Sequence, residues 1–481
     1  MHLFGGFNFK TIKFAVSFHF EKTNMKNILL KFILSFILIL GITCSAQDKK
    51  WSLQECVDYA VKNNISIKQS DLDLETTKIG KNAALGSFLP SINGNAAHSW
   101  NIGLNQNITT GLLENQTTQF TSAGLNSNIT IYNGLQNQNK LRKANLSIIA
   151  AQYQVAKMKD DISLNVANAF LQILFNKENL KVQKEQLNND ENQQKKSEEL
   201  VDAGSVARGD LLDVKATVAS DKQRVIAAEN NLFLSKLSLA QLLQIEDFQN
   251  FDIADVNYNA TSSVTMLEKP EKIVEKAKKD RVELKIARAN LEVAEKDIKI
   301  AKGAFQPSLI GFYSFSSRVS YADRIIGLDI NGAPILSGPM PFFDQFSNNK
   351  GHNFGVQLNI PILNGFSAKN NLDRYKIALE SSKINEKQAV LDLERNVYTS
   401  ITNAKGALNA YESAVAAFDA RKEAFNYAKE KYAVGMMNSF DYTQSQTLYT
   451  NAQSEVLRTK FDYIFKVKIV EFYFGIPITE K

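Results

Sequence analysis

The sequence predicts an α+β membrane protein made of a duplicated unit, each unit combining two membrane β-strands with one long coiled-coil helical hairpin. Three observations carry this prediction. An internal repeat covers most of the chain, very long helical stretches contain no proline, and short segments between the helices alternate between apolar and polar residues. A helical period beside a strand period within each repeat indicates a mixed fold.

The composition of the 481-residue chain argues against an enzyme. It contains only 8 Pro, 4 His and 2 Cys, which excludes a disulfide scaffold and leaves little material for a metal cluster. The sequence has no Gly-rich phosphate loop, no paired CxxC motif and no nucleophile elbow. We therefore expect no catalytic residues, no cofactor and no metal site.

Residues 1–46 form an upstream extension and a secretory signal peptide. Lys26 and Lys31 precede an apolar run over 32–42, and small residues follow at Ser45 and Ala46. A run this short suits a cleaved signal rather than a spanning helix. Translation starting at Met25 would account for the patternless residues 1–24. Cys44 is the alternative processing site as a lipid-attachment cysteine, but Thr43 before it fits that motif poorly.

Removing residues 1–46 leaves 51 basic and 49 acidic residues, because this segment contains 5 Lys and one Glu. The mature chain is nearly neutral, so no strong positive field remains to attract nucleic acid. We expect no nucleic-acid partner.

The internal repeat defines the domain organisation. Residues 53–91 align without a gap on 270–308, at an offset of 217. A second offset of 231 pairs ITIYNGL (129–135) with IPILNGF (360–366). A period of this length indicates a duplicated domain rather than a solenoid of short repeats. The predicted parts are a first repeat (47–245), a linker (246–269) and a second repeat (270–481).

Very long helices dominate each repeat. Proline is absent from 91–269 and from 362–476, and glycine is absent from 136–201. Val155, Ile162, Val166 and Ile173 follow helical spacing within this stretch. Residues 137–200 alone would span roughly 96 Å at the rise of an α-helix. Shorter helices over 53–88, 207–245, 270–304 and 438–474 are expected to stack end to end beside the long ones.

Each hairpin turns at a glycine. The segments AGSVARGDLLD (203–213) and VGMMNSFDYTQ (434–444) both place a Gly at a helix end and an Asp early in the next helix. Gly204 and Gly435 suit left-handed C-terminal caps, and Asp210 and Asp441 suit the positive end of the following helix dipole.

Four segments of about ten residues alternate with period two, around 92–104, 121–131, 309–315 and 354–360. Their length and one apolar face match tilted membrane strands, although a small soluble sheet on the helices is the plainer alternative. Four strands cannot close a barrel and open edges are not tolerated in hydrocarbon, so several chains must contribute. The predicted lipid-facing positions are Trp100, Ile102, Leu125, Ile129, Tyr313, Phe315, Val356 and Leu358.

The whole mature chain resembles the TolC-like outer-membrane efflux proteins. The resemblance rests on the order and duplication of LQECVDYAVKNN, FLPS, ITIYNG and AGSVARGDLLD, then FQPS, IPILNG and VGMMNSFDYTQ. It implies a homotrimer that forms one 12-stranded β-barrel in the outer membrane of a Gram-negative bacterium, continued by an α-helical barrel across the periplasm. It also implies a passive duct for a tripartite efflux or type I secretion system, with a periplasmic adaptor and an inner-membrane pump of RND or ABC type.

By position, the resemblance gives roles to the hairpin tips. The expected adaptor-docking residues are Gly204, Ser205, Val206, Gly435, Met436 and Met437. The candidates for a cation-attracting pore constriction are Asp202, Asp210, Asp213 and Asp441, although a carboxylate near a helix start is more often a cap. An exported coiled-coil scaffold or adhesin without a pore is the alternative function.

The positions of two further segments can also be predicted. The longer loop 318–353 of the second repeat should be extracellular, where it would cover the pore or contact surface ligands. The linker 246–269 should pack around the middle of the helical barrel.

Overall fold

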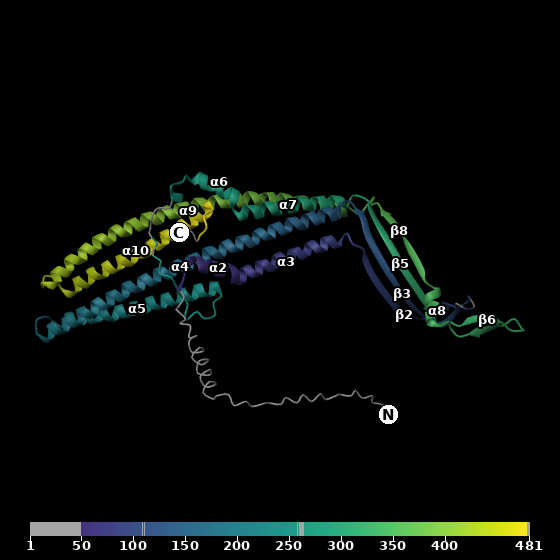
Figure 1. Ribbon diagram of the computed structural model, residues 1–481, viewed down its shortest axis with the longest axis horizontal. Coiled ribbons are helices and arrows are strands. Elements are labelled where there is room, and N and C mark those ends of the chain that lie inside the picture. The colour runs from purple at the N-terminus through teal and green to yellow at the C-terminus, as the bar shows by residue number, and fades with distance from the viewer. Residues whose placement is uncertain (1–49, 108, 110, 257, 259–263, 479–481) are drawn as a thin grey trace, which may run out of the picture. The chain divides into compact units, whose positions relative to one another are not determined.

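In the computed structural model, residues 50–107, 109, 111–256, 258 and 264–478 are described (Figure 1). The predicted signal peptide and Cys44 lie outside the described residues. The described residues from Lys50 onward form one compact unit. No described helix is both long enough and apolar enough to cross a bilayer.

Two long helical hairpins confirm the predicted rods. The first consists of α4 (Gln136–Asp202) and α5 (Arg208–Leu243), and the second of α9 (Ser367–Ala433) and α10 (Ser439–Phe474). Both α4 and α9 have 67 residues, which corresponds to about 100 Å of helix. The hairpin tips therefore lie far from the strands (Figure 1).

The shorter helices stack beside the long ones, as predicted, but the N-terminal ones are divided. Residues 53–88 form α2 (Leu53–Asn63) and α3 (Ile65–Gly86), and 270–304 form α6 (Pro270–Asp280) and α7 (Val282–Gly303). The expectation of one continuous helix in each place was wrong. At the first break, Asn64 accepts a hydrogen bond from the Ser66 amide and donates one to the Leu242 carbonyl, 2.9 Å away. The Asn64 side chain thus begins α3 and fixes it to α5.

The helices are packed in the same lateral order as the strands to which they connect. Helix α3 packs on α4, α4 on α7, and α7 on α9. These helices lead into or out of β2 (Ser91–Gln106), β3 (Leu113–Asn133), β5 (Ser308–Ser320) and β8 (Gly351–Asn359). The four strands form one antiparallel sheet in the order β2-β3-β5-β8. Toward the tips, α5 and α10 pack on α4 and α9, respectively.

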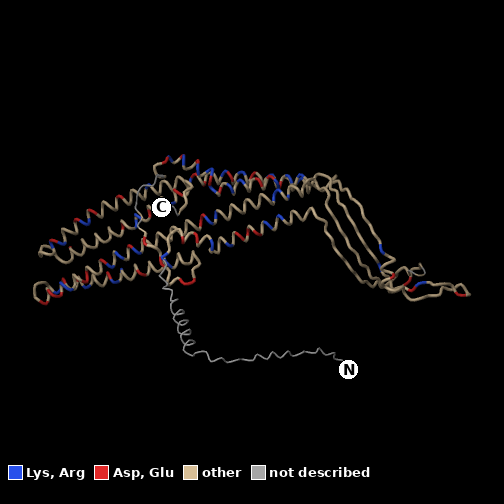
Figure 2. The backbone as a smooth tube through the Cα atoms, viewed as in Figure 1, with Lys and Arg blue, Asp and Glu red and all other residues tan. Residues whose placement is uncertain are grey.

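The strands β2 and β3 are longer than the predicted ten residues, with 16 and 21 residues. The long segment of the second repeat also contains more than a loop. It forms a small hairpin of β6 (Arg324–Leu328) and β7 (Pro334–Ser337), followed by the short helix α8 (Phe342–Asn348). The described strands of the four-stranded sheet carry few charged residues, whereas charges are dense along the helices (Figure 2).

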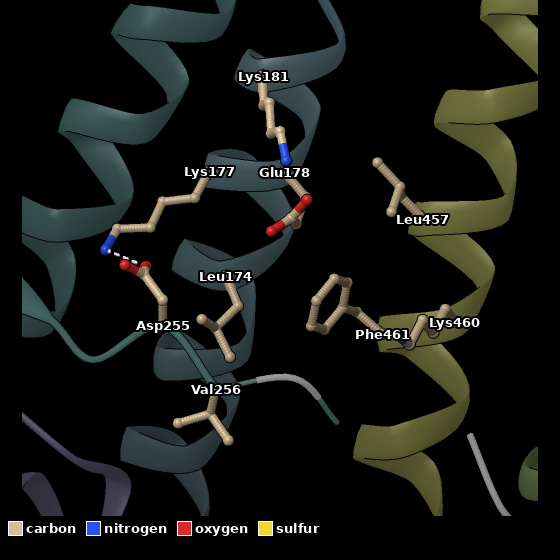
Figure 3. A pocket seen from close by; sticks show the side chains of 9 residues that line it. All are labelled: Leu174, Lys177, Glu178, Lys181, Asp255, Val256, Leu457, Lys460 and Phe461. Atoms are coloured by element: carbon tan, nitrogen blue, oxygen red, sulfur yellow. Dashed lines mark hydrogen bonds and ion pairs between the residues drawn. The ribbon is translucent and has the colours of Figure 1, made fainter. Parts of the chain in front are cut away.

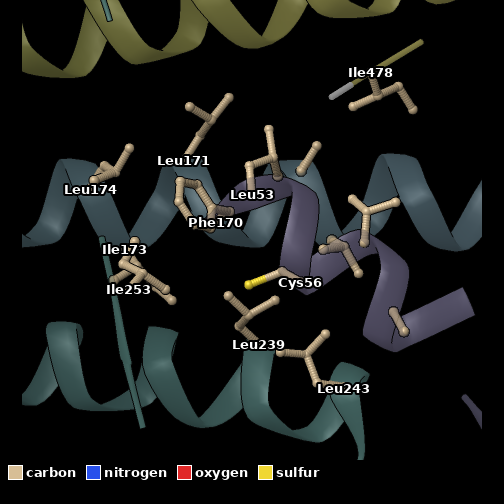
Figure 4. Packing of buried hydrophobic residues seen from close by; sticks show 14 of the residues in the cluster. Leu53, Cys56, Phe170, Leu171, Ile173, Leu174, Leu239, Leu243, Ile253 and Ile478 are labelled. Atoms are coloured by element: carbon tan, nitrogen blue, oxygen red, sulfur yellow. The ribbon is translucent and has the colours of Figure 1, made fainter. Parts of the chain in front are cut away.

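The apolar core lies where the middle of α4 meets α2 and α5 (Figure 4). Phe170, Ile173, Leu239 and Leu243 are fully buried there, together with Cys56. The linker joins this core through Ile253, whose short strand β4 (Asp252–Ile253) pairs in parallel with β1 (Lys50–Trp51). The described part of the linker therefore packs near the middle of the long helix α4.

Candidate functional site

Both hairpin tips are built as the sequence predicts. Gly204 has a φ of 68° and Gly435 a φ of 76°, both in the left-handed region. At the first tip the Ser205 amide donates to the Leu200 carbonyl at 2.8 Å, and the Gly204 amide donates to the Val201 carbonyl at 2.9 Å. These paired bonds define a Schellman motif, which satisfies the last carbonyl groups of α4.

The second tip repeats the motif, with the Met436 amide donating to the Lys431 carbonyl at 2.8 Å. The two tips differ in the side chains that they expose. The first exposes Ser205 and Arg208, whereas the second exposes the apolar side chains of Val434, Met436 and Phe440. Phe440 was not among the predicted tip residues, although it follows directly on the turn.

The four predicted constriction carboxylates separate into different environments. Asp210 and Asp213 come together on α5, where the buried Ser439 hydroxyl lies 3.0 Å from Asp210 Oδ1 and 3.4 Å from Asp213 Oδ2. Asp441 exchanges hydrogen bonds with Asn438, the N-cap residue of α10. Asn438 is therefore the cap, and the Asp441 carboxylate supports it from the first turn of α10. Asp202 is exposed at the end of α4.

Sequence reasoning missed a cluster of buried polar residues about 18 Å from the first tip. We call Gln186, Asp190, Asp221, Gln446 and Thr450 the buried polar cluster. Asp190 and Asp221 are only 3% and 2% exposed. The signal was present in the sequence, because these polar residues fall at core positions of α4, α5 and α10 where apolar residues are the rule.

Hydrogen bonds in this cluster connect the two hairpins. On α4, Gln186 Nε2 donates to Asp190 Oδ2 at 2.8 Å. From α10, Gln446 Nε2 donates to Asp190 Oδ1 at 2.6 Å, and Thr450 Oγ1 donates to Gln186 Oε1 at 2.9 Å. Asp221 comes from α5 and receives a hydrogen bond from Arg224 Nη1 at 2.9 Å. Polar groups therefore join α4 to α10, and Asp221 of α5 interacts with Asp190 beside them.

The strand register places all eight predicted lipid-facing positions on one face of the sheet. Leu125 lies opposite both Gly94 and Phe315, and Tyr313 lies opposite Phe354. Directly opposed residues share a face and residues two apart along a strand return to it, so the remaining positions follow. We call this the Trp100 face; it includes Trp100, Ile102, Leu125, Ile129, Tyr313, Phe315, Val356 and Leu358.

The opposite face is less polar than predicted. Asn95 and Asn126 are hydrogen-bonded to each other there at 3.1 Å, as expected for an Asn-rich face. However, Phe120, Ile310 and Phe312 lie on the same face. Phe312 covers Gly355 on the neighbouring strand, where an added Cβ would approach the ring to 3.1 Å. The large side chain fills the space that the glycine leaves.

The helix α8 takes the place where β8 would continue beside β5. Gln345 donates to the Ser320 carbonyl at 2.8 Å and accepts from the Ser320 amide at 2.9 Å, which satisfies backbone groups beyond the end of β8. The Ser317 hydroxyl donates to the Phe346 carbonyl at 2.7 Å. The 318–353 segment is therefore anchored to the rim of the sheet rather than forming a free loop.

One cavity of the described structure lies between α4, α10 and the linker. It has a volume of about 320 Å³ and is lined mainly by Lys177, Glu178, Lys181, Asp255 and Phe461 (Figure 3). Lys177 is bound to Asp255 at 2.9 Å and to the Ile253 carbonyl at 2.9 Å, so it fixes the linker to α4. Among the described residues, no group of three or more His, Cys, Asp or Glu side chains is placed to hold a metal ion.

Comparisons with known proteins agree with this architecture. The family model "Outer membrane efflux protein" matches residues 57–243 and 273–464. The outer membrane protein TolC of Vibrio cholerae is 23% identical over 322 residues, covering 66% of this chain and 68% of that protein.

Solved structures share the fold at low sequence identity. The Campylobacter jejuni CmeC outer membrane channel superposes with a TM-score of 0.71 at 19% identity, covering 89% of this chain and 87% of that one. The Vibrio cholerae outer membrane protein VceC gives a TM-score of 0.71 at 14% identity, covering 89% and 96%. The duplicated strand pairs, the two hairpins and the matched residues together place this chain in the outer membrane efflux protein family, as a channel subunit of the outer membrane that extends into the periplasm.

Proposed function

We propose that three copies of this chain close into one passive export channel, which docks on a periplasmic adaptor and on an inner-membrane pump of RND or ABC type. The observation that carries the proposal is the open sheet. Within the described chain, β2 and β8 each have one unpaired edge. Such edges are not tolerated in hydrocarbon, and three four-stranded sheets supply the strands of a closed barrel.

The helices beside the open edges support the same assembly. Exposed apolar residues recur every seven positions on α3 and α9, and this spacing is typical of a coiled-coil contact that lacks its partner. On α3 they are Ile65, Leu72 and Ile79, and on α9 they are Ile377, Ile384, Leu391 and Tyr398. Since α3 and α9 are the outer members of the row α3-α4-α7-α9, a neighbouring copy would join them.

The Trp100 face is proposed to contact lipid. It carries the exposed side chains of Trp100, Ile102, Tyr313, Val356 and Leu358. In a closed barrel, either this face or the Asn-rich face of each sheet would point outward. Aromatic and aliphatic side chains are favoured against lipid, whereas amide side chains are favoured against a water-filled lumen.

The tips are proposed to carry the contacts with the adaptor and the constriction of the pore. Gly204, Ser205, Val206, Gly435, Met436 and Met437 form the two turns farthest from the sheet. Asp210 and Asp213 converge on one side of this end, and Asp202 and Asp441 lie nearby in the chain. A ring of three copies would concentrate negative charge there, which attracts cations. We assign no catalytic residue, so energy for transport would come from the pump.

Planar-bilayer recording on the reconstituted, full-length mature protein tests the channel. We expect discrete single-channel conductance from trimers. An exported scaffold or adhesin without a pore would form the same helices but give no conductance. Crosslinking in cells, followed by identification of the copurified inner-membrane protein, would then identify the pump.

A further inference from the structure

The buried polar cluster contains two carboxyl groups with too few donors. Both oxygens of Asp190 accept from amide groups of Gln186 and Gln446. In Asp221, Oδ1 accepts from Arg224, whereas Oδ2 is buried and has no hydrogen-bond donor. Asp221 interacts with Asp190. Two ionised carboxylates cannot satisfy each other, because neither has a proton to donate.

A proton on this pair resolves the conflict. Burial, followed by the hydrogen bond and the charge of Asp190, raises the pKa of Asp221 to about 7, although the Arg224 guanidinium acts in the opposite direction. A protonated carboxyl between the two residues would donate one hydrogen bond and remove one buried charge.

Among the described groups around Asp190 and Asp221, those considered next add no positive charge to that of Arg224. From α10, burial followed by the charge of Asp190 raises the pKa of Tyr442 to about 12, so this phenol is neutral. From α9, Tyr432 stacks on Tyr442 with ring centroids 4.6 Å apart. On the adjacent surface, Lys222 of α5 is paired with Glu191 of α4 at 3.2 Å.

The pair lies where the two hairpins are joined mainly by polar contacts. We call these contacts the hairpin seam: Gln183 to Ser454, Asp190 to Gln446, and Asp210 to Ser439. Farther from the tips, α4 and α10 share apolar contacts, with Phe170, Phe461 and Ile464 in one core cluster. The hairpin seam is therefore the part of this junction that a change of charge affects most directly.

We propose that Asp190 and Asp221 share one proton and act as a pH-responsive latch, in which loss of the proton loosens the hairpin seam and favours an open tip. A second negative charge in this buried site requires water or a separation of α5 from α4. Either change disturbs the hydrogen bond by which Asp190 is connected to α10. The inference rests on the proposed function, because tip opening changes flow only in an assembled channel.

The test is bilayer conductance of the reconstituted trimer between pH 5 and pH 9. For the wild type, we expect the ratio of open to closed channels to rise with pH around neutrality, by up to about tenfold per pH unit for one proton. Asp221→Asn supplies a permanent donor to Asp190, so conductance should be low and independent of pH in this range. Asp190→Asn should flatten the profile as well.

Glu199→Gln is the matched control, because it removes an exposed carboxylate of α4 that lies outside the buried polar cluster. It should keep the wild-type profile. If Asp221→Asn keeps it too, the latch is excluded while the channel stands. If the wild type conducts at no pH, the proposed function itself fails.

A second readout follows the hairpin seam without measuring flow. Gln183 and Ser454 are in contact across it, so the pair Gln183→Cys and Ser454→Cys should form a disulfide. At each pH, the rate of disulfide formation is divided by the rate for the same cysteine pair in the Asp221→Asn variant. This ratio removes the pH dependence of the thiol chemistry itself. We expect the relative rate to fall as pH rises. A constant ratio would overturn the latch.

Discussion

The backbone of Gly134, at the turn from β3 into α4, lies directly against Gly303 at the end of α7. A Cβ atom added to Gly134 would stand 2.3 Å from the Gly303 carbonyl oxygen, and one added to Gly303 would stand 2.6 Å from the Gly134 carbonyl oxygen. In the internal repeat, Gly365 is the equivalent of Gly134 at the offset of 231, and Gly86 is the equivalent of Gly303 at the offset of 217. Both of these glycines have open space around them in a single chain.

In the proposed trimer, this asymmetry predicts which residues of two neighbouring copies meet. If the copies repeat the internal packing, Gly365 meets Gly86 of the partner subunit. The neighbouring positions agree. Tyr132 is hydrogen-bonded to Gln306 within the chain, and the same offsets carry this pair to Leu363 and Leu89. These leucines are 85% and 67% exposed, and they would cover each other between subunits.

Gly86→Val should therefore weaken the proposed trimer while the subunit still folds, because the added side chain meets nothing within one chain. Overpacking of a close contact typically costs about 1–3 kcal/mol, here once for each of three interfaces. Native mass spectrometry in detergent would measure the shift from trimer to monomer. Gly338→Val, in an exposed loop with open space, is the control. Gly303→Val should instead destabilise the subunit itself.

The same offsets predict how β8 pairs with β2 of the neighbouring subunit. They carry the observed pair Ser127 and Tyr313 to Leu358 opposite Ala96. Leu358→Cys combined with Ala96→Cys should give disulfide-linked trimers on a non-reducing gel, since opposed Cβ atoms lie about 5 Å apart. Leu358→Cys with Ile102→Cys, six residues farther along β2, should give none. Equal crosslinking of both pairs would contradict this register.

The architecture was predictable because the spacing of apolar residues along the sequence differs between helices and strands. Proline-free helical stretches gave the two hairpins, and alternation gave four strands that share one apolar face. The repeat explains why both tips have the same glycine cap. Features without periodicity were missed. The α2–α3 break depends on Asn64 reaching the Leu242 carbonyl, and α8 depends on Gln345 completing the edge of β5.

The candidate site was predictable only in part for a similar reason. A glycine cap is a local feature, so the tip turns could be located from a few residues. The buried polar cluster joins side chains that are far apart in sequence, such as Asp190 and Gln446. Its members appear as exceptions to an apolar stripe, and a single sequence does not indicate which exceptions meet.

Lys177→Met should release the linker from α4. Lys177 contacts Asp252 at 3.0 Å as well as Asp255 and the Ile253 carbonyl. Loss of charged hydrogen bonds at this half-buried site should cost about 1–3 kcal/mol. Chymotrypsin should then cleave faster at Phe251, which is buried beside this contact, as followed by mass spectrometry. Lys184→Met, which removes an exposed ion pair with Glu229, should leave the cleavage rate unchanged.

The contact of Asp252 with Lys177 and Lys236 should weaken in acid and not in base. Burial tends to raise the pKa of Asp252, but hydrogen bonds from Lys236 and Lys177 outweigh burial and hold it below its usual value. A depressed carboxyl pKa stabilises the fold above the unfolded pKa of about 3.9, and the effect is lost as pH falls through the folded pKa. Hydrogen exchange in β4 should therefore accelerate only in strong acid. Acceleration already at pH 6 would contradict the assignment.

Met436→Ser tests the docking role of the tips. Met436 is 76% exposed and its side chain takes no part in the cap, which uses its backbone amide. The hairpin should fold and the channel should conduct as before, since only exposed apolar area is lost. Removal of a buried anchor from an interface typically costs about 1–3 kcal/mol of binding, so crosslinking to the adaptor in cells and resistance to exported compounds should both fall. Lys387→Ser, on an exposed position nearer the sheet end of α9, should change neither. If both variants behave alike, the exposed methionine is not part of the adaptor contact, and the more polar first tip becomes the surface to test.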